Sequence, residues 1–446
     1  MINIESYRQA LRELPSYIKN AEFNIERITS YMISLSNNKV SGNSYSDVSE
    51  VFVRASGDRT GFAYTQDLSE EPEKLIIRAY NNSLDIEFSN TNILNTSGQS
   101  EVLLENSTVD IQEMINYAGI LEEKFKNSHA SIDNVIVESR IDIRKSNVLN
   151  SFFMDKTCER KICYLSALIT SKHEGKVYNV SCAMSGQKYS DINMDEMTDQ
   201  AVNQLISQFN AISYKSGIYS CVLDKTVMVN IMMTAWQLFS GIKYKEGALS
   251  GRLNSIIGSE SFTLIDSPAH NKTGYCYEFD CEGTVSSENV LVDRGYFKGL
   301  MHNLLTSQDM GHEPTGNAGR YALLSGTIPT DIIVIPKILY IKPGEKNRKD
   351  LLKQLNDGVY ITESYDVFHS INISSGNFSI PCRGTVIRNG EKAENITEMT
   401  ISGNLVDLFN SIVEAGSDIY IEEFLKKSYC IGSPSVIVNN LNINAG

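Results

Sequence analysis

Alternation of polar and apolar residues between Ile132 and Met184 constrains the fold of this 446-residue chain more than any other feature. Successive side chains of a strand point to opposite faces, so alternation predicts strands with one buried face. Glu174-Gly175 and Lys145-Ser146-Asn147 are the expected turns of this region. The sequence therefore predicts a group of long strands joined by short turns.

Apolar residues at helical spacing predict helices on both sides of this strand group. The expected helices cover about residues 1–35, 70–80, 110–127 and 197–212. A hairpin is expected between the first two, with its turn at Ser56-Gly57-Asp58-Arg59. We place a domain boundary near residue 215, so that residues 1–215 form an N-terminal α+β domain.

Residues 216–446 are predicted to form a C-terminal domain dominated by a large antiparallel β-sheet, which makes the fold class α+β. The two clearest hairpin turns are Asp293-Arg294-Gly295 and Asn389-Gly390. Three further elements are expected: an apolar strand at 227–232, a helix after Asn404 and a closing strand at 435–438.

Charge and hydropathy exclude several classes of partner and location. Lys and Arg total 40 against 54 Asp and Glu, a net charge of −14, and there is no basic run. Nucleic acid and anionic membrane surfaces are therefore not expected partners. The chain has no stretch of about 18 apolar residues and no secretory signal pattern. Its eight cysteines form no C-x-x-C pair, so we expect reduced thiols in the cytoplasm.

Motifs of the common hydrolases and nucleotide enzymes are missing. The chain has six histidines, and neither His173-Glu174 nor His312-Glu313 has a second histidine at zinc-binding spacing. We interpret both as solvated loop histidines. Ser185 with Lys188, and Lys272-Thr273-Gly274, fit two short motifs of penicillin-recognising enzymes. The third motif does not lie between them, so this interpretation is rejected.

Asp280 and Glu282 are the best acid–base candidates by residue type. Residues i and i+2 of a strand face the same side, so both carboxylates could line one cleft. A solvated strand edge or turn capping is the structural alternative.

Several segments in order resemble the TldD/PmbA family, also called modulator-of-gyrase or TldD/TldE metallopeptidases. They are Phe279-Asp280-Cys281-Glu282-Gly283, the hairpin with Gly295, and Thr315-Gly316-Asn317-Ala318-Gly319-Arg320. The region from 374 to 409, the end of the chain from 433 and the N-terminal hairpin are also similar. The resemblance covers nearly the whole chain.

The resemblance implies a subunit of the PmbA/TldE type. TldD-type subunits carry H-E-x-x-x-H on a helix and a Cys near the C-terminus as third zinc ligand. The matching stretch here, VMVNIMMTAWQLFSGIKYKEG, has no histidine, and the first family His falls near Ala235-Trp236. Cys430 lies about where the ligand Cys would be, but a lone thiolate makes no zinc site. We therefore expect no catalytic residue and no metal in this chain.

The resemblance implies a cavity-completing subunit of a cytosolic zinc metallopeptidase that processes or degrades small unstructured peptides. A TldD-type partner would supply the zinc in a heterodimer, and a homodimer is also possible. The alternative is a homodimeric peptide-binding protein without hydrolytic activity. A thiol hydrolase using Cys281 or Cys430 has no histidine placed by sequence to activate it.

The residues expected to bind peptide or line the subunit interface are Asp280, Glu282, Asn317 and Arg320. They combine acceptors, an amide and a fork-shaped donor that can bind a peptide backbone or each other. The structural alternative is that Arg320 pairs with a carboxylate and fixes the loop 311–320.

Overall fold

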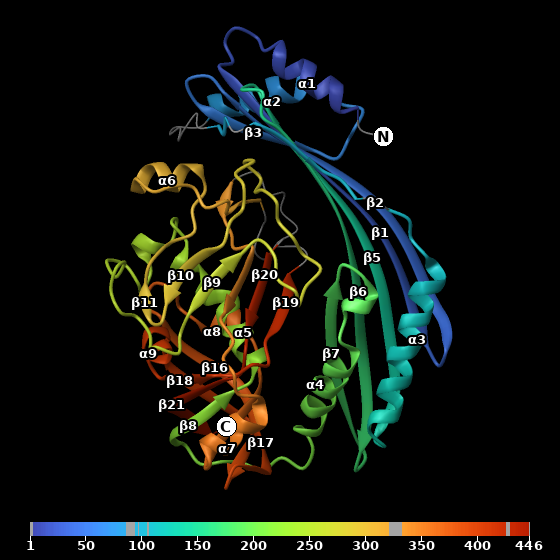
Figure 1. Cartoon of the computed structure of the whole chain (residues 1–446), viewed down its shortest axis with the longest axis vertical. Coiled ribbons are helices and arrows are strands. Elements are labelled where there is room, and N and C mark those ends of the chain that lie inside the picture. Colours follow the sequence, from blue (N-terminus) through green and yellow to red (C-terminus); the bar gives the residue numbers. More distant parts are fainter. Residues whose placement is uncertain are drawn as a thin grey trace.

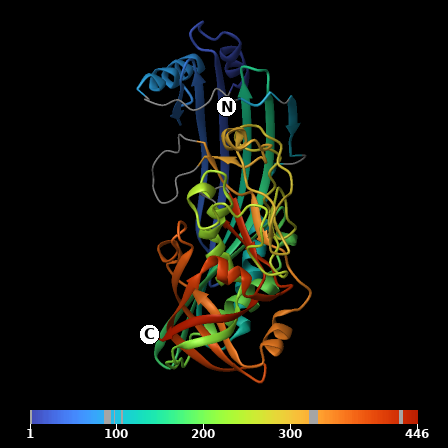
Figure 2. The same cartoon turned by 90° about the vertical axis from the view of Figure 1, so that its left-hand side faces the viewer.

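The computed structural model describes residues 3–85, 94–96, 98–104, 107–320, 332–424 and 429–445. A long curved sheet from the N-terminal half runs along one side of the molecule, and the C-terminal half packs beside it (Figure 1). The view from the side shows the two halves overlapping along the same long axis (Figure 2). The predicted α+β class is confirmed. The boundary near residue 215 stays a prediction.

The N-terminal sheet has the order β3-β2-β1-β5-β6-β4, and β7 pairs with β6 beside β4. All its pairings are antiparallel except that of β4 with β6. Its strands are β1 (Asn20–Ser36), β2 (Lys39–Ser56), β3 (Thr60–Thr65), β4 (Gln99–Val102), β5 (Ile132–Asn150), β6 (Asp155–His173) and β7 (Lys176–Gly186).

Two groups of helices cover this sheet. α3 (Ile111–Ser128) and α4 (Met194–Ile206) share one hydrophobic cluster with β1, β5 and β6. α1 (Ile4–Arg12) and α2 (Pro72–Leu84) form a second cluster with the N-terminal half of β1 and with β2. The sheet is therefore covered at one end and along one face by its own half of the chain.

The C-terminal half contains two larger sheets and one small one. The first has the order β11-β10-β9-β14-β20-β19, in which only β14 and β20 are parallel among the described pairs. Its strands are β9 (Leu264–Ser267), β10 (Asn289–Asp293), β11 (Tyr296–Phe297), β14 (Ile338–Ile341), β19 (Tyr420–Phe424) and β20 (Tyr429–Ser433). The small sheet pairs β12 (Ala318–Gly319) with β13 (Ile333–Val334).

The other large sheet has the order β17-β16-β15-β8-β21-β18, and a further pairing of β17 with β21 closes five of these strands into a ring. Its strands are β8 (Gly217–Leu223), β15 (Gly358–Ser364), β16 (Asn377–Arg388), β17 (Glu391–Asn404), β18 (Ile412–Ala415) and β21 (Val436–Ala445). The helices of this half are α5 (Lys225–Ala235), α6 (Leu304–Met310), α7 (Arg348–Leu355), α8 (Val367–Ser370) and α9 (Leu405–Asn410).

Three sequence predictions of local structure are wrong. Residues 20–36 form strand β1 where a helix was expected. Apolar and polar residues alternate from 21 to 26, which is the period of a strand, but Ala21, Ile25, Ile28 and Met32 also fit helical spacing. Residues 227–232 belong to helix α5, whose apolar run is continuous because nearly every residue is buried. The expected turn at Lys145-Ser146-Asn147 lies inside β5, which pairs with β1 and β6 there.

The other turn predictions and the helix expected after Asn404 are confirmed. The turns at 56–59, 174–175, 293–295 and 389–390 join antiparallel strands. Asn389 and Gly390 both have positive φ, as a type I′ hairpin turn requires. Asn404 caps the helix that follows it by accepting a hydrogen bond from Val406 N.

None of the described helices is long and apolar enough to span a membrane.

Candidate functional site

Asp280 fixes a tight loop at the junction of the two halves. Its side chain is buried. Oδ1 accepts hydrogen bonds from the backbone N–H groups of Glu282 and Thr284, both at 2.9 Å, and Oδ2 accepts one from Ala318 N at 2.9 Å. Burial raises the pKa of Asp280 to about 7, although Lys337 opposes the shift. These contacts make Asp280 an acceptor for backbone donors of its own loops.

Glu282 belongs to a buried ion network that joins the halves. Arg54 donates from Nη1 to Glu282 Oε1 at 3.0 Å and from Nη2 to Glu22 Oε1 at 2.9 Å. The second oxygen of Glu282 accepts from Leu304 N at 2.9 Å, at the start of α6. Burial raises the pKa of Glu22, and Arg54 opposes that rise. The network therefore ties β1 and β2 to the C-terminal half.

Asn317 completes the same buried junction. Its Nδ2 donates to Asp266 Oδ2 at 2.7 Å and to the carbonyl oxygen of Ile335 at 2.9 Å. Burial raises the pKa of Asp266 to about 6, opposed by its hydrogen bond with Asn317. Ala318, the next residue, donates to Asp280, so the structure brings Asn317 and Asp280 side by side.

The guanidinium of Arg320 lies over two aromatic rings of the N-terminal sheet, 5.2 Å from the centre of Phe52 and 6.0 Å from that of Phe62. Burial lowers the pKa of Arg320. The four predicted residues thus share the junction between the halves, and none of them lines the pocket described below. Their role in binding a peptide or a subunit stays a prediction.

By the resemblance, α5 and the 3-10 turn after it, Trp236–Phe239, stand where the zinc-binding helix of TldD-type subunits is expected. Ala235 and Trp236 are buried, and the Trp236 ring packs edge-on against Tyr429 with centres 5.7 Å apart. Neither side chain offers a donor that a zinc ion could use. The residues at this place do not fit the metal.

Cys430 faces away from that helix. It follows Tyr429 on β20, so the two side chains point to opposite faces. Cys430 packs in a different cluster, with Ile338 and Tyr277, and burial raises the pKa of its thiol well above the usual range. Across the described ranges, no group of three or more His, Cys, Asp or Glu is arranged to hold a metal ion.

Of the two histidines expected to be solvated, His173 is half-buried and stacks on the ring of Phe209, with ring centres 4.3 Å apart. His312 is exposed as expected, but its Nδ1 lies 3.0 Å from Nε2 of His302, which is buried. Burial, with His312 beside it, lowers the pKa of His302 to about 4. The pair fixes the end of α6 against the loop before Thr315, whose Oγ1 accepts from His302 N at 2.7 Å.

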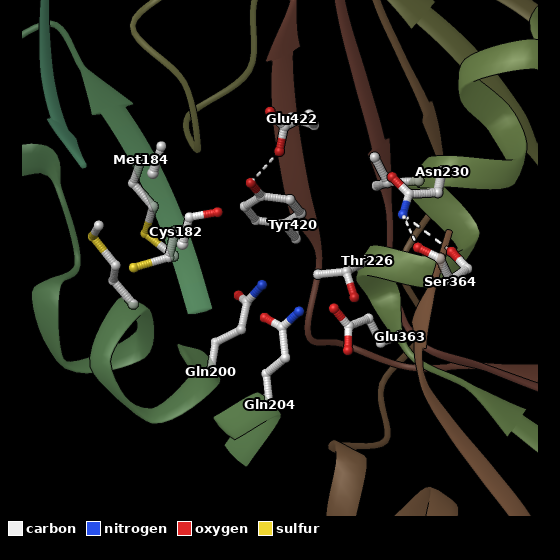
Figure 3. Close-up of a pocket in the computed structure, with 14 residues that line it drawn as sticks. Cys182, Met184, Gln200, Gln204, Thr226, Asn230, Glu363, Ser364, Tyr420 and Glu422 are labelled. Atoms are coloured by element: carbon white, nitrogen blue, oxygen red, sulfur yellow. Dashed lines mark hydrogen bonds between the residues drawn. The ribbon is translucent and has the colours of Figure 1, made fainter. Parts of the chain in front are cut away.

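A pocket of about 340 Å³ lies between the halves, where two sheets present their edges to each other (Figure 3). In the described part of the chain, β7 pairs only with β6 and β19 only with β20. The N-terminal wall comes from β7 and α4: Ser181, Cys182, Ala183, Met184, Met197, Gln200 and Gln204. The C-terminal wall comes from α5, β15 and β19: Thr226, Val229, Asn230, Glu363, Ser364, Tyr420 and Glu422.

Two carboxylates and three carboxamides dominate the polar lining. Tyr420 donates its hydroxyl hydrogen to Glu422 Oε2, and Tyr365 donates to Glu363 Oε2 at 2.6 Å. Burial raises the pKa of Glu422. Gln200 and Gln204 point into the pocket from α4 (Figure 3). The lining is therefore rich in oxygen acceptors.

Beside this pocket the two edges meet at the carboxyl group of Glu423, which is half-buried. Glu423 accepts hydrogen bonds from the hydroxyl of Ser185 and from that of Thr273, the latter at 2.6 Å. Ser185 Oγ also accepts from Gly274 N at 2.9 Å. Burial raises the pKa of Glu423 to about 7, although both hydroxyl donors oppose the shift. The serine and the K-T-G segment set aside in the sequence thus meet as a structural contact between the halves.

Sequence reasoning missed the pocket entirely. Its polar residues come from helices and strands up to 240 positions apart, such as Gln200 on α4, Glu363 on β15 and Glu422 on β19. The one local signal was a pair of adjacent acids, Glu422 and Glu423, in a predominantly apolar C-terminal region. Such a pair is common on solvated surfaces, so it predicts no site by itself.

Comparison with known proteins adds a family to this geometry. The family model described as PmbA/TldA metallopeptidase C-terminal domain matches residues 216–445, and that of PmbA/TldA metallopeptidase domain 1 matches residues 21–83. The chain belongs to the PmbA/TldD metallopeptidase family. The family relation predicted from the sequence is thereby confirmed.

Curated relatives include a metalloprotease of Methanothermobacter thermautotrophicus, 30% identical over 65% of this chain and 64% of its own length. A metalloprotease of Archaeoglobus fulgidus is 29% identical over 49% of this chain and 50% of its own length. The matches therefore span between one half and two thirds of these relatives. A TldD homologue of Saccharolobus solfataricus, named a zinc metalloprotease, is 22% identical over 69% of each chain.

Solved structures share the whole fold. One is a protein of Thermotoga maritima named as a modulator of a DNA gyrase, with a TM-score of 0.81 and 25% sequence identity. The superposition covers 99% of this chain and 100% of that chain. TldE of Thermococcus kodakarensis has a TM-score of 0.79, 19% identity, and 100% of both chains covered. The latter likeness concerns the fold alone.

Proposed function

We propose that this chain is the non-catalytic, PmbA/TldE-type subunit of a two-subunit cytoplasmic peptidase that cleaves small unstructured peptides. The observation that carries the proposal is the chemistry of α5 and its 3-10 extension. There, Ala235 and the buried Trp236–Tyr429 pair occupy the place of the family's zinc-binding residues, and Cys430 packs elsewhere. In the proposal, a TldD-type partner supplies zinc, its ligands and the carboxylate that activates water.

The peptide-binding part of the proposal rests on the two sheet edges that flank the pocket. The outer edges of β7 and β19 carry backbone N–H and C=O groups that a strand can pair with. An extended peptide that adds to such an edge is held by main-chain hydrogen bonds, which do not depend on its sequence. This form of binding suits a peptidase that accepts varied unfolded substrates.

The central test is a comparison of three samples: this chain, a TldD-type paralogue from the same genome, and their mixture. We expect the mixture to cleave an unstructured peptide faster than the paralogue alone and to elute as one complex in gel filtration. Cleavage by this chain alone would overturn the assignment of a non-catalytic subunit. A mixture that neither associates nor cleaves faster would overturn the cavity-completing role.

A second candidate function is peptide binding by a homodimer without hydrolysis. This function needs the same open sheet edges but no catalytic partner. It would be favoured if a dimer of this chain binds peptide with an affinity that the TldD-type paralogue does not change. The names of relatives that refer to DNA gyrase gain no support here, because the net charge of −14 disfavours contact with DNA.

The metal content gives an independent test. We expect the purified chain to hold no stoichiometric zinc after dialysis, because no donor at Ala235 or Trp236 can bind it and Cys430 is buried in another cluster. Elemental analysis measures this directly. One tightly held zinc ion per chain would contradict the subunit assignment.

A further inference from the structure

We propose that the pocket between β7 and β19 is a subsite for a positively charged peptide side chain, lysine or arginine, which Glu363 and Glu422 bind. The inference rests on the proposed function only in taking the ligand to be a peptide. It adds a preference for one class of side chain to a binding mode that would otherwise be independent of sequence.

Charge is the first argument. Two carboxylates and no lysine or arginine contribute to the lining. Lys225, which lies close by, has its partner outside the cavity and donates to Glu196 Oε1 at 3.0 Å. Arg383 donates to Gln208 at 3.1 Å and lies 3.9 Å from Glu363. The pocket therefore has an excess of negative charge that a ligand cation would neutralise.

The orientation of the carboxylates is the second argument. At Glu363 the described contacts, from Tyr365 and Arg383, all end on Oε2, and at Glu422 the Tyr420 hydroxyl also ends on Oε2. In the described residues no hydrogen bond reaches Oε1 of either carboxylate. The tyrosine hydroxyls thus hold both groups in place while one oxygen of each stays available to an N–H donor.

Gln200 is a third and independent observation. Its Oε1 is buried in the pocket wall and has no hydrogen-bond partner in the parts of the chain that the structure describes. A buried acceptor without a donor destabilises the unliganded state. The terminal torsion of a glutamine is broad, so a small rotation turns this oxygen to a bound ammonium or guanidinium group. Gln204, one helical turn along, offers a second carboxamide.

Size and apolar surface fit a long basic side chain. The volume of about 340 Å³ is at the small end of the range for ligand pockets, roughly 300–1,000 Å³, which suits one side chain better than a larger ligand. Met184 and Met197 in the N-terminal wall and Val229 in the C-terminal wall supply apolar surface. The methylene stem of lysine or arginine packs on such surface while its charged end reaches a polar group.

The test is peptide binding by the full chain, measured by isothermal titration calorimetry. The probes are two blocked pentapeptides, acetyl-Ala-Ala-Lys-Ala-Ala-amide and the same peptide with norleucine, which keeps the stem and lacks the charge. We expect the lysine peptide to bind at least about tenfold more tightly, since charge-assisted hydrogen bonds to a buried carboxylate are worth about that factor or more. The preference should weaken as salt is raised.

Substitutions of the two carboxylates test whether the pocket causes the preference for the lysine peptide. We expect Glu363→Gln combined with Glu422→Gln to remove the preference while the norleucine peptide binds as before. Glu398→Gln is the matched control, because Glu398 is an exposed carboxylate that lines a different groove. It should keep the full preference.

The outcomes separate this inference from the proposed function. Equal binding of both peptides, or a preference that survives the double substitution, would overturn the charged subsite and leave the peptide-binding role standing. Binding of neither peptide would overturn the subsite together with the peptide-binding role of this chain. Association with a TldD-type paralogue would still be judged by its own mixing experiment.

Discussion

Replacing Arg54 should destabilise the protein far more than replacing an equivalent arginine at the surface. Arg54 is buried and binds two buried carboxylates, Glu22 and Glu282, at 2.9 and 3.0 Å. In Arg54→Ala both carboxylates lose their cation in a place that water does not reach. Breaking a buried pair in this way costs about 3–5 kcal/mol.

Arg27→Ala is the matched control. Arg27 pairs with Asp47 at 2.6 Å on the neighbouring part of the same sheet, but 38% of its side chain is exposed. An exposed pair is worth about 0.2–1 kcal/mol because water solvates both partners. For a melting unit of about 150–250 residues, such as either half of the chain, 1 kcal/mol corresponds to about 2–4 °C. We therefore expect the melting temperature to fall by at least about 6 °C for Arg54→Ala and by at most about 4 °C for Arg27→Ala.

The assay is differential scanning calorimetry of both variants at pH 8 and pH 5.5. Burial raises the pKa of Glu22 and Arg54 opposes the rise, so removing Arg54 lets that pKa rise further. A carboxyl with a raised pKa in the folded state takes up a proton as the pH falls, and the folded state then gains stability relative to the unfolded chain. The penalty of Arg54→Ala should therefore be smaller at pH 5.5. Equal effects of the two substitutions at pH 8 would refute the reasoning.

Three further outcomes follow from the junction. Between about pH 4.5 and pH 7 Glu423 stays protonated only in the folded state, so the parent protein should lose stability as the pH rises through this range. Glu423→Gln should remove that loss. An equal change of melting temperature between pH 5 and pH 8 in both proteins would contradict this. Asp280→Ala should lower stability by about 3 kcal/mol or more in urea unfolding, because three backbone N–H groups lose their acceptor, whereas Asp280→Asn should cost less. Arg320→Ala should lower the melting temperature and leave cleavage by the reconstituted pair intact if Arg320 anchors its loop; unchanged stability with lost cleavage would assign it to peptide binding.

The two halves illustrate how far sequence reasoning reached. The motif residues Asp280 and Asn317 were singled out together, and the structure places them side by side in a buried junction. Their partners could not be predicted, because Asp266, the partner of Asn317, and Lys337, the cation beside Asp280, lie far from them along the chain. The family relation came from ordered motifs, whereas the environment of α5 and of Cys430 needed the packing of the C-terminal half.

Sequence alone determined the features that depend on a few adjacent residues: the Asn389-Gly390 turn, the Asn404 cap and the amphipathic stripe of α3. Turn geometry and capping are local, so nearby residues suffice to specify them. Tertiary structure decided that α5 is a helix, since burial on all sides hides its period, and it decided between the strand pattern and the helix pattern that residues 20–36 both fit. It also created the pocket, because side chains from β7, α4, α5, β15 and β19 meet only when the two sheets pack edge to edge.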